Sequence, residues 1–248
     1  MAVFDALLEL ADDHLILGHR LSEWCGHAPM LEEDLAMPNM GLDLIGTART
    51  LYDHAGKLEG KGRSEDDLAY LRGEREYRNC LLVERPNEDF AHTMLRQFYF
   101  AAFMRPYWLA ALNSTDEVVR GVAGKAEKEM AYHIRHAGEW VIRLGDGTEE
   151  SAARIRDAVE ALHIYVDELF DSSDAAQEAE AAGLLPVRAD LRATWDRTVA
   201  EVFAEALLEQ PTAAYAQRGG RQGIHNETLG HLLAEMQVVH RAHPGARW

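Results

Sequence analysis

The chain has 248 residues, of which 47% are apolar, and its 42 acidic and 25 basic residues give a net charge of −17. This length and apolar content suffice for one sizeable hydrophobic core, so we expect a single domain over residues 1–248. Nucleic acids and anionic membranes are bound by clustered Lys and Arg, and the acidic balance argues against both as partners.

Helical periodicity begins at the amino terminus. Ala2–Trp24 repeats apolar residues at i, i+3, i+4 and i+7, which is typical of a helix with one face in the core. After a break at Cys25–Pro29, a second long helix is predicted from Leu31 to about Lys57, with a kink at Pro38. Its inward side chains are predicted to be Leu35, Leu42, Ile45 and Tyr52.

Two capping patterns mark the starts of the next helices. Ser64-x-x-Asp67 resembles a helix cap and predicts a shorter helical segment to about Leu82. A third long helix is predicted over Glu88–Leu112, with a bend near Pro106. The capping box Ser114-x-x-Glu117 then predicts the start of a fourth long helix.

The remainder of the chain is also predicted to be helical. Further helices are expected at Glu149–Phe170, Ala175–Ala182 and Arg188–Glu209, and a last one is capped by Asn226 or Thr228 and runs to about His240. No alternating run of β-branched residues predicts a strand. We therefore predict an all-α protein, a ferritin-like helical bundle with additional C-terminal helices.

The fourth long helix, Asp116–Leu144, carries the most suggestive polar pair. His133 lies near the centre of its apolar stripe, and Glu129 lies one turn earlier at the edge of that stripe. Residues four apart share a helix face, so the two side chains can meet. A carboxylate and an imidazole on a buried helix face are either a satisfied structural pair or part of a metal site.

A ferritin-like di-iron centre takes one Glu from each of two helices and Glu-x-x-His from each of two others. An acid stands three residues before a histidine at Asp89-x-x-His92 and Glu160-x-x-His163, and about two such matches are expected by chance. The first match lies at the start of its helix, and Glu129 and His133 are spaced by four rather than three. We therefore favour a structural role and expect no metal or other cofactor on this chain. The alternative is a self-contained di-iron or dimanganese carboxylate oxidoreductase that uses Glu129, His133, Glu160 and His163.

Other polar residues are interpreted in structural terms. Asn39 and Asp43 are predicted to join a buried polar network, because they lie on or beside the apolar face of the second helix. Asp12, Asp13 and His14 are predicted to be surface or edge residues. Arg218 and Arg221 are interpreted as surface arginines in a glycine-rich loop, with a weaker indication of an anion or partner contact.

The sequence also indicates a cellular setting. Cys25 and Cys80 are too few for a disulfide framework and favour free thiols in a reducing compartment. The first ten residues contain acids and no basic segment, which is not the pattern of a signal peptide. No apolar run reaches the ~18 residues that a membrane span needs. We therefore expect a cytoplasmic protein.

Several stretches together resemble the C subunit of phenylacetyl-CoA epoxidase, the ring-oxidising enzyme of aerobic phenylacetate degradation. The resemblance covers essentially the full length. The matching stretches are Arg20-Leu-Ser-Glu-Trp-Cys-Gly-His-Ala-Pro29, Asp34-Leu-Ala-x-x-Asn39-x-Gly-Leu-Asp-Leu44-x-Gly-x-Ala-Arg49, Leu81-Leu-Val-Glu-x-Pro-Asn87, Glu129-x-x-Tyr-His133, Gly145-x-Gly-Thr148, Gly223-x-His225-x-Glu227-x-Leu-Gly230 and Leu233-Ala-Glu-Met-Gln237.

The resemblance implies a ferritin-like fold and a place in a multicomponent monooxygenase. In that family the di-iron centre is on a separate A subunit, which binds the CoA thioester and inserts one oxygen atom from O2, while a reductase supplies electrons from NADPH. The C subunit is the metal-free structural partner of the A subunit. The resemblance thus implies a hetero-oligomer and no catalytic residue on this chain, and it leaves self-association open.

Overall fold

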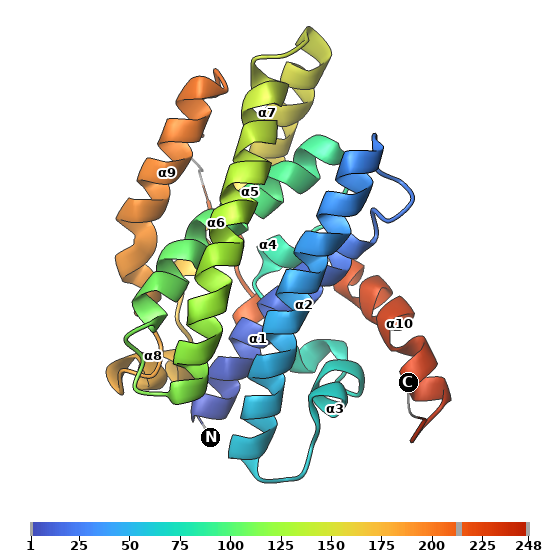
Figure 1. The fold of residues 1–248 in the computed structure, drawn as a ribbon, viewed down its shortest axis with the longest axis vertical. Helices are drawn as coiled ribbons and strands as arrows, with labels where there is room; N and C mark the ends of the chain where they lie inside the picture. The colour runs from blue at the N-terminus through green and yellow to red at the C-terminus, as the bar shows by residue number, and fades with distance from the viewer. Residues whose placement is uncertain (1, 212–214, 247–248) are drawn as a thin grey trace. The chain divides into compact units, whose positions relative to one another are not determined.

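The computed structural model describes residues 2–211 and 215–246. Contacts within the chain cluster into two compact units, Met1–Pro86 with Gly219–Trp248 (unit 1) and Asn87–Arg218 (unit 2). Within the two described ranges the regular structure is entirely helical, which confirms the predicted all-α class (Figure 1). The expectation of one domain over residues 1–248 stays a prediction.

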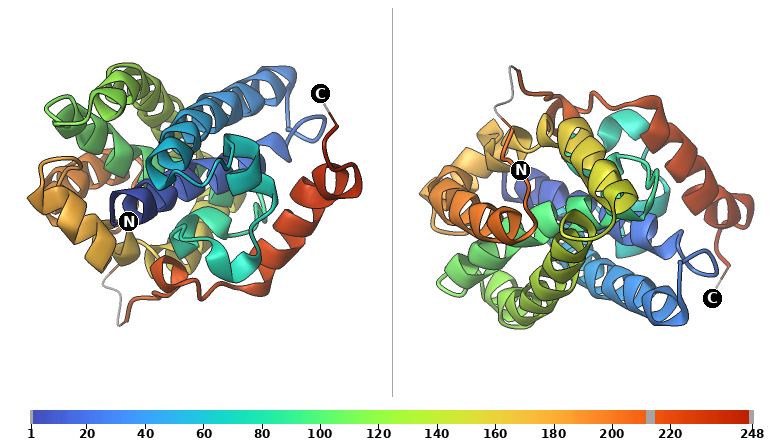
Figure 2. Two further views of the ribbon diagram at one scale, coloured as in Figure 1. Left: turned by 90° about the horizontal axis from the view of Figure 1, so that it is seen from below. Right: turned by 90° about the horizontal axis from the view of Figure 1, so that it is seen from above.

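Unit 1 is organised around a pair of long helices. Helices α1 and α2 run antiparallel, since Gly18 lies against Gly41 and Tyr52 bonds back to Asp12 (Figure 1). The α-helices of unit 1 are α1 (Ala2–Ser22), α2 (Leu31–Glu59), α3 (Glu65–Tyr70), α4 (Leu81–Glu84) and α10 (Glu227–Ala242), with short 3₁₀ turns at Glu74–Glu76 and Gly220–Gln222. Helix α10 packs against α3, so the C-terminal part of the chain returns to the N-terminal part (Figure 2).

Unit 2 contains a second antiparallel pair, formed by α5 and α6. The Phe90 ring at the start of α5 meets Trp140 of α6 edge-on, and two turns further along α5, Gln97 meets His133. The α-helices of unit 2 are α5 (Phe90–Ala111), α6 (Glu117–Gly145), α7 (Glu149–His163), α8 (Asp174–Ala181) and α9 (Arg192–Glu205), with 3₁₀ turns at Asp167–Phe170 and Arg188–Leu191. Helices α7 and α9 pack against both members of the pair. In the described part of the chain, no helix combines the length and apolarity needed to cross a bilayer.

The four predicted long helices are present, and their ends depend on local caps. Ser64 and Asp67 form the predicted capping box of α3. Helix α6 is capped differently from the prediction, because the Asp116 carboxylate accepts from the amides of Val118 and Val119. Ser114 instead donates its hydroxyl to the carbonyl of Leu184, at 2.6 Å.

The predicted helix from Ser64 to Leu82 is wrong in its second half. Helix α3 ends at Tyr70, and a 3₁₀ turn and the short helix α4 follow instead of one continuous helix. Between α3 and α4 the chain leaves helical geometry, and the Arg72 side chain, which is 3% exposed, turns into the core. A tertiary interaction therefore overrides the local helical pattern.

Two leucines of α2 do not lie where the sequence predicts. Tyr52 is buried as expected, but Leu35 and Leu42 are exposed. Helix α2 is apolar on more than one side, and periodicity alone does not say which side meets α1. The side that carries the small residues Gly41 and Ala48 packs inward, because it permits a closer approach of the two helix backbones.

Candidate functional site

The two residues of the predicted pair on α6 differ in burial and in their partners. His133 is fully buried, and its Nδ1 accepts a hydrogen bond from the Gln97 amide of α5 at 3.0 Å. With Nδ1 as an acceptor, the ring proton of a neutral His133 is on Nε2. Glu129 lies at the edge of the buried face and forms an ion pair with Lys125, one turn earlier. The structure thus places His133 in the core of unit 2 and Glu129 at its margin.

Replacement of His133 by leucine is expected to lower the free energy of unfolding by about 1–2 kcal/mol, because the Gln97 amide group loses its acceptor inside the core. Lys125→Ala on the same helix is the control and should change stability by less than about 0.5 kcal/mol, since the Lys125 side chain is largely exposed. Urea denaturation of the parent chain and of the two variants measures both changes in the free energy of unfolding. Equal effects of the two substitutions would contradict a structural role for the His133–Gln97 bond.

The remaining residues of the metal-enzyme alternative do not fit a di-iron centre. Glu160 is exposed, although a bridging carboxylate has to face a bundle interior. His163 packs near the rings of Tyr99 and Trp195, and burial together with the Arg192 charge lowers its pKa. Across residues 2–211 and 215–246, no three His, Cys, Asp or Glu side chains gather in a metal-binding geometry.

Asp89-x-x-His92, which matches the acid-x-x-His spacing of a di-iron centre, forms a helix cap in the structure. Asp89 is the N-cap residue of α5, and its carboxylate accepts from the His92 backbone amide at 2.9 Å. The same oxygen lies 2.7 Å from the His92 ring nitrogen. These bonds hold the pKa of Asp89 below its usual value despite partial burial, which opposes the shift.

Asn39 does not belong to a buried polar network within this chain, and that prediction is wrong. It is exposed, because it lies on the side of α2 that faces away from α1. Asp43 is only partly buried. Arg49, the nearest basic residue after them on α2, is exposed and pairs with Glu65 at 3.3 Å.

An extensive cluster of buried polar side chains lies in unit 1, and it includes residues for which the sequence predicts a surface position. Asp12, Asp13 and His14 of α1 are 0%, 1% and 0% exposed. The signal that could have revealed this is the apolar residues on every side of α1, since a helix that is apolar all round is buried. We call Asp12, Asp13, Glu84, Arg72, Arg221 and His225 the ion cluster.

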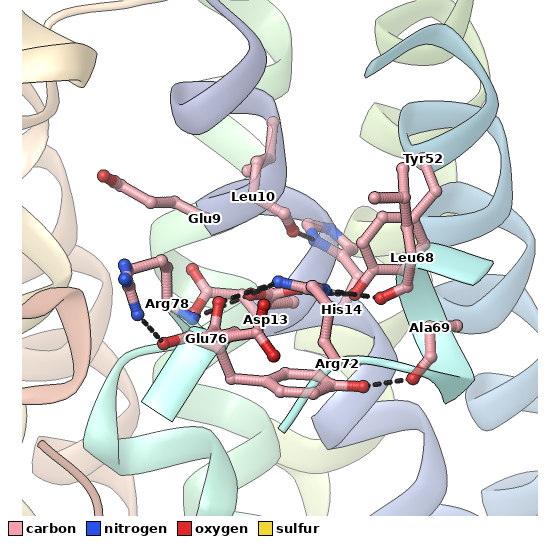
Figure 3. A network of polar contacts seen from close by, with 12 residues as sticks. Glu9, Leu10, Asp13, His14, Tyr52, Leu68, Ala69, Arg72, Glu76 and Arg78 are labelled. Atoms are coloured by element: carbon pink, nitrogen blue, oxygen red, sulfur yellow. Dashed lines mark hydrogen bonds and ion pairs between the residues drawn. The ribbon is translucent and has the colours of Figure 1, made fainter. Parts of the chain in front are cut away.

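Asp12 is held by four donors. The Tyr52 hydroxyl donates at 2.5 Å, the Arg78 backbone amide at 2.7 Å, and both terminal nitrogens of Arg72 donate to the same carboxylate. In Figure 3, Tyr52 comes from α2, whereas Arg72 and Arg78 both come from the segment between α3 and α4. Burial alone would lower the pKa of the Arg72 guanidinium, but the Asp12 carboxylate outweighs it and raises that pKa. Burial and the Asp12 charge also raise the pKa of Tyr52, which therefore remains a neutral donor.

Asp13 forms the second ion pair, and its partner comes from the far end of the sequence. Both terminal nitrogens of Arg221 donate to the Asp13 carboxylate, at 3.0 and 2.8 Å. The Cys80 amide also donates to it, at 2.7 Å. Arg221 is 4% exposed, so its prediction as a surface residue is wrong. The Asp13 carboxylate offsets the opposing effect of burial and raises the pKa of Arg221.

Glu84 of α4 completes the ion cluster. One of its carboxylate oxygens accepts from the Asn79 amide at 2.9 Å and lies 2.7 Å from His225 Nδ1. The other accepts from the Asn226 backbone amide, at 2.9 Å. His225 Nε2 lies 3.0 Å from the Tyr77 carbonyl. Both ring nitrogens thus face acceptors, and only an imidazolium can donate to both.

Stability should depend on pH through His225. Burial lowers its pKa, but the Glu84 carboxylate outweighs burial and raises the pKa above 6.5, the value of a free histidine. A raised pKa in the folded state stabilises the fold fully below pH 6.5, and this contribution is lost as the pH rises through the folded value. Urea denaturation at intervals from pH 6 to pH 9 should show this loss. In a His225→Gln variant the free energy of unfolding should not show this decline. An identical pH profile in both proteins would contradict the role of His225.

The chemistry of the ion cluster is that of a structural junction. Its three carboxylates are each held by several donors, and arginines and an imidazolium neutralise their charges. Buried charges with this degree of pairing join α1, the segment from Arg72 to Glu84, and the chain after Gly219 in one arrangement. Oxygen atoms engaged in this way are poorly disposed to bind a metal or to exchange protons with a substrate.

Comparisons with known proteins bear on the whole chain. A family profile described as "Phenylacetic acid catabolic protein" matches residues 1–248. The chain belongs to this family. It is also 42% identical, over 244 residues and 97% of each chain, to the C subunit of 1,2-phenylacetyl-CoA epoxidase from Escherichia coli (strain K12). The predicted resemblance is thus confirmed, and the helix pairs of the two units agree with the ferritin-like class predicted for the family.

Proposed function

We propose that the chain is the structural, metal-free C subunit of a di-iron phenylacetyl-CoA epoxidase in aerobic phenylacetate degradation. It supports a catalytic A subunit, which binds phenylacetyl-CoA and inserts one oxygen atom from O2 into the aromatic ring. The observation that carries this proposal is the 42% identity, over 97% of both chains, to a protein named as the C subunit of that epoxidase.

The geometry of the polar residues supports a non-catalytic role. Oxygen activation requires a reducible metal with open coordination positions. Here the buried imidazole of His133 is bonded to Gln97, and Glu160 is on the surface. The buried carboxylates of unit 1 are held by arginine, tyrosine and amide donors. These side chains keep the helices in place and leave the chemistry to a partner.

The test is reconstitution from separate components. The purified chain should contain little iron and should not epoxidise phenylacetyl-CoA when reductase, NADPH and O2 are supplied. Mixed with its A subunit it should elute as one larger species, and the A subunit should be less soluble or less active without it. An A subunit that is equally soluble and active in the absence of this chain would overturn the proposal.

The competing function is a self-contained metal oxidoreductase that uses Glu129, His133, Glu160 and His163. Metal analysis of the chain alone distinguishes the two functions. About two iron or manganese ions per chain, lost together in a Glu160→Gln variant, would favour the competing function. Glu160 is exposed, so its substitution should leave the fold intact and make the comparison interpretable.

A further inference from the structure

One face of α2 has large apolar side chains in solvent. Leu31, Leu35 and Leu42 are 70%, 59% and 66% exposed. At 100° per residue these three side chains lie within about 40° of one another around the helix. The partly exposed Pro38 and Ile45 extend the same line. Helical periodicity predicts Leu35 and Leu42 in the core, and their exposure leaves three turns of this helix face uncovered.

The spacing is that of a helix-packing seam. Leu31, Leu35, Pro38, Leu42 and Ile45 follow one another at intervals of four, three, four and three residues. This is the alternation of the a and d positions in a heptad, which one helix presents to another that lies along it. Isolated exposed leucines are common on soluble proteins, but a continuous line of them at this spacing marks an interaction surface. We call these five residues the α2 seam.

The charges beside the α2 seam restrict its occupant. Residues 30–48 contain three acids with exposed or partly exposed side chains, Glu32, Asp34 and Asp43, besides the buried Glu33. The first basic residue after them is the exposed Arg49, whose charge is paired with Glu65 at 3.3 Å. Glu32 is exposed, and Asp34 and Asp43 are partly exposed. A second copy of this chain would bring the same acids against these ones, and each copy has a net charge of −17. Like charges across an interface disfavour association, whereas a basic rim on the partner favours it.

We propose that the α2 seam is the surface on which the chain docks its catalytic partner, through an amphipathic helix of that partner whose apolar stripe is flanked by Lys and Arg. This inference rests on the proposed function, which supplies the partner, and it adds the contact surface. Helix α2 is well suited to the task because an adjacent side, about 80–100° around the helix from Leu42, is fixed on α1 through Gly41 and Tyr52. The seam is thus presented on a rigid element.

The test compares leucines on and off the seam. The double variant Leu35→Ser/Leu42→Ser should raise the Kd for the purified A subunit roughly 100-fold, since buried interface anchors carry most of the binding energy. Leu58→Ser is the control, because Leu58 is 50% exposed on the same helix but points about 160° away from Leu42. Its Kd should stay within about twofold of the parent value. Circular dichroism and urea melts should confirm that both variants are folded.

The contribution of the acidic side chains to binding is measured separately. Glu32→Gln/Asp43→Asn should slow association with the A subunit and flatten its dependence on salt, with little change in the dissociation rate. Hydrogen exchange on the unmodified complex should show slowed exchange of amides in residues 31–45. Faster association of the Glu32→Gln/Asp43→Asn variant would contradict a basic partner.

The outcomes separate this inference from the proposed function. If the unmodified chain does not bind the A subunit, the proposed function fails, and this inference fails with it. If the complex forms but Leu35→Ser/Leu42→Ser binds as tightly as the parent, only the α2 seam is overturned. If the chain alone is a dimer that the same substitutions convert to monomers, the seam belongs to a second copy and the proposed occupant is wrong.

Discussion

Replacement of Arg221 by methionine is expected to lower the free energy of unfolding by about 3–5 kcal/mol, the cost of leaving one charge of a buried pair without its partner. Methionine keeps most of the apolar stem but leaves the Asp13 carboxylate without two donors at 3.0 and 2.8 Å. The backbone carbonyl of Arg78 also loses a donor, at 2.9 Å. Urea denaturation of the parent and the variant measures the difference.

Arg218 provides a matched control, because it is three residues away and was predicted to resemble Arg221. Its side chain is 49% exposed and pairs with Asp171 at the surface of unit 2, at 2.6 Å. Arg218→Met should therefore change stability by less than about 1 kcal/mol. Adding Asp13→Leu to Arg221→Met removes the unpaired charge and should recover part of the loss. Equal losses for the two arginine variants would contradict the assignment of Asp13–Arg221 as a buried structural pair.

Replacement of Gly41 by alanine is expected to destabilise the chain by about 2–3 kcal/mol, through overpacking where α1 and α2 approach each other. A Cβ atom at Gly41 would lie 2.9 Å from the Gly18 carbonyl oxygen and 3.0 Å from the Ser22 hydroxyl. The nearer neighbour is backbone, so the two helices have to separate. Thermal unfolding and urea denaturation measure the loss.

The control is the same substitution where there is room for a methyl group. Gly121 lies inside α6, and a Cβ atom there would meet nothing within 4 Å. Gly121→Ala should stabilise the chain by about 0.5–1 kcal/mol, because alanine is the better helix former. A Gly41→Ala variant that is also stabilised would show that the close contact between Gly18 and Gly41 does not exist in solution.

The elements that depend on neighbouring residues are predictable from the sequence alone. The four long helices follow from apolar periodicity, which involves side chains three or four residues apart. The Ser64–Asp67 capping box was found for the same reason, because its two bonds span three residues. The motifs that indicated the family are also linear, and the full-length family match agrees with them. His133 was predicted to be buried from its place on the α6 stripe, and it is.

The burial of particular polar residues and the exposure of particular apolar residues depend on tertiary contacts. Asp13 meets Arg221 across 208 residues of sequence, and no local pattern relates the two. Leu35 and Leu42 are exposed because the glycine face of α2, rather than its leucine face, offers α1 the closer approach. In both cases the outcome depends on which surfaces meet after the helices have formed. The shape and charge of segments distant in the sequence determine which surfaces pack together. Helical periodicity contains no information about those segments.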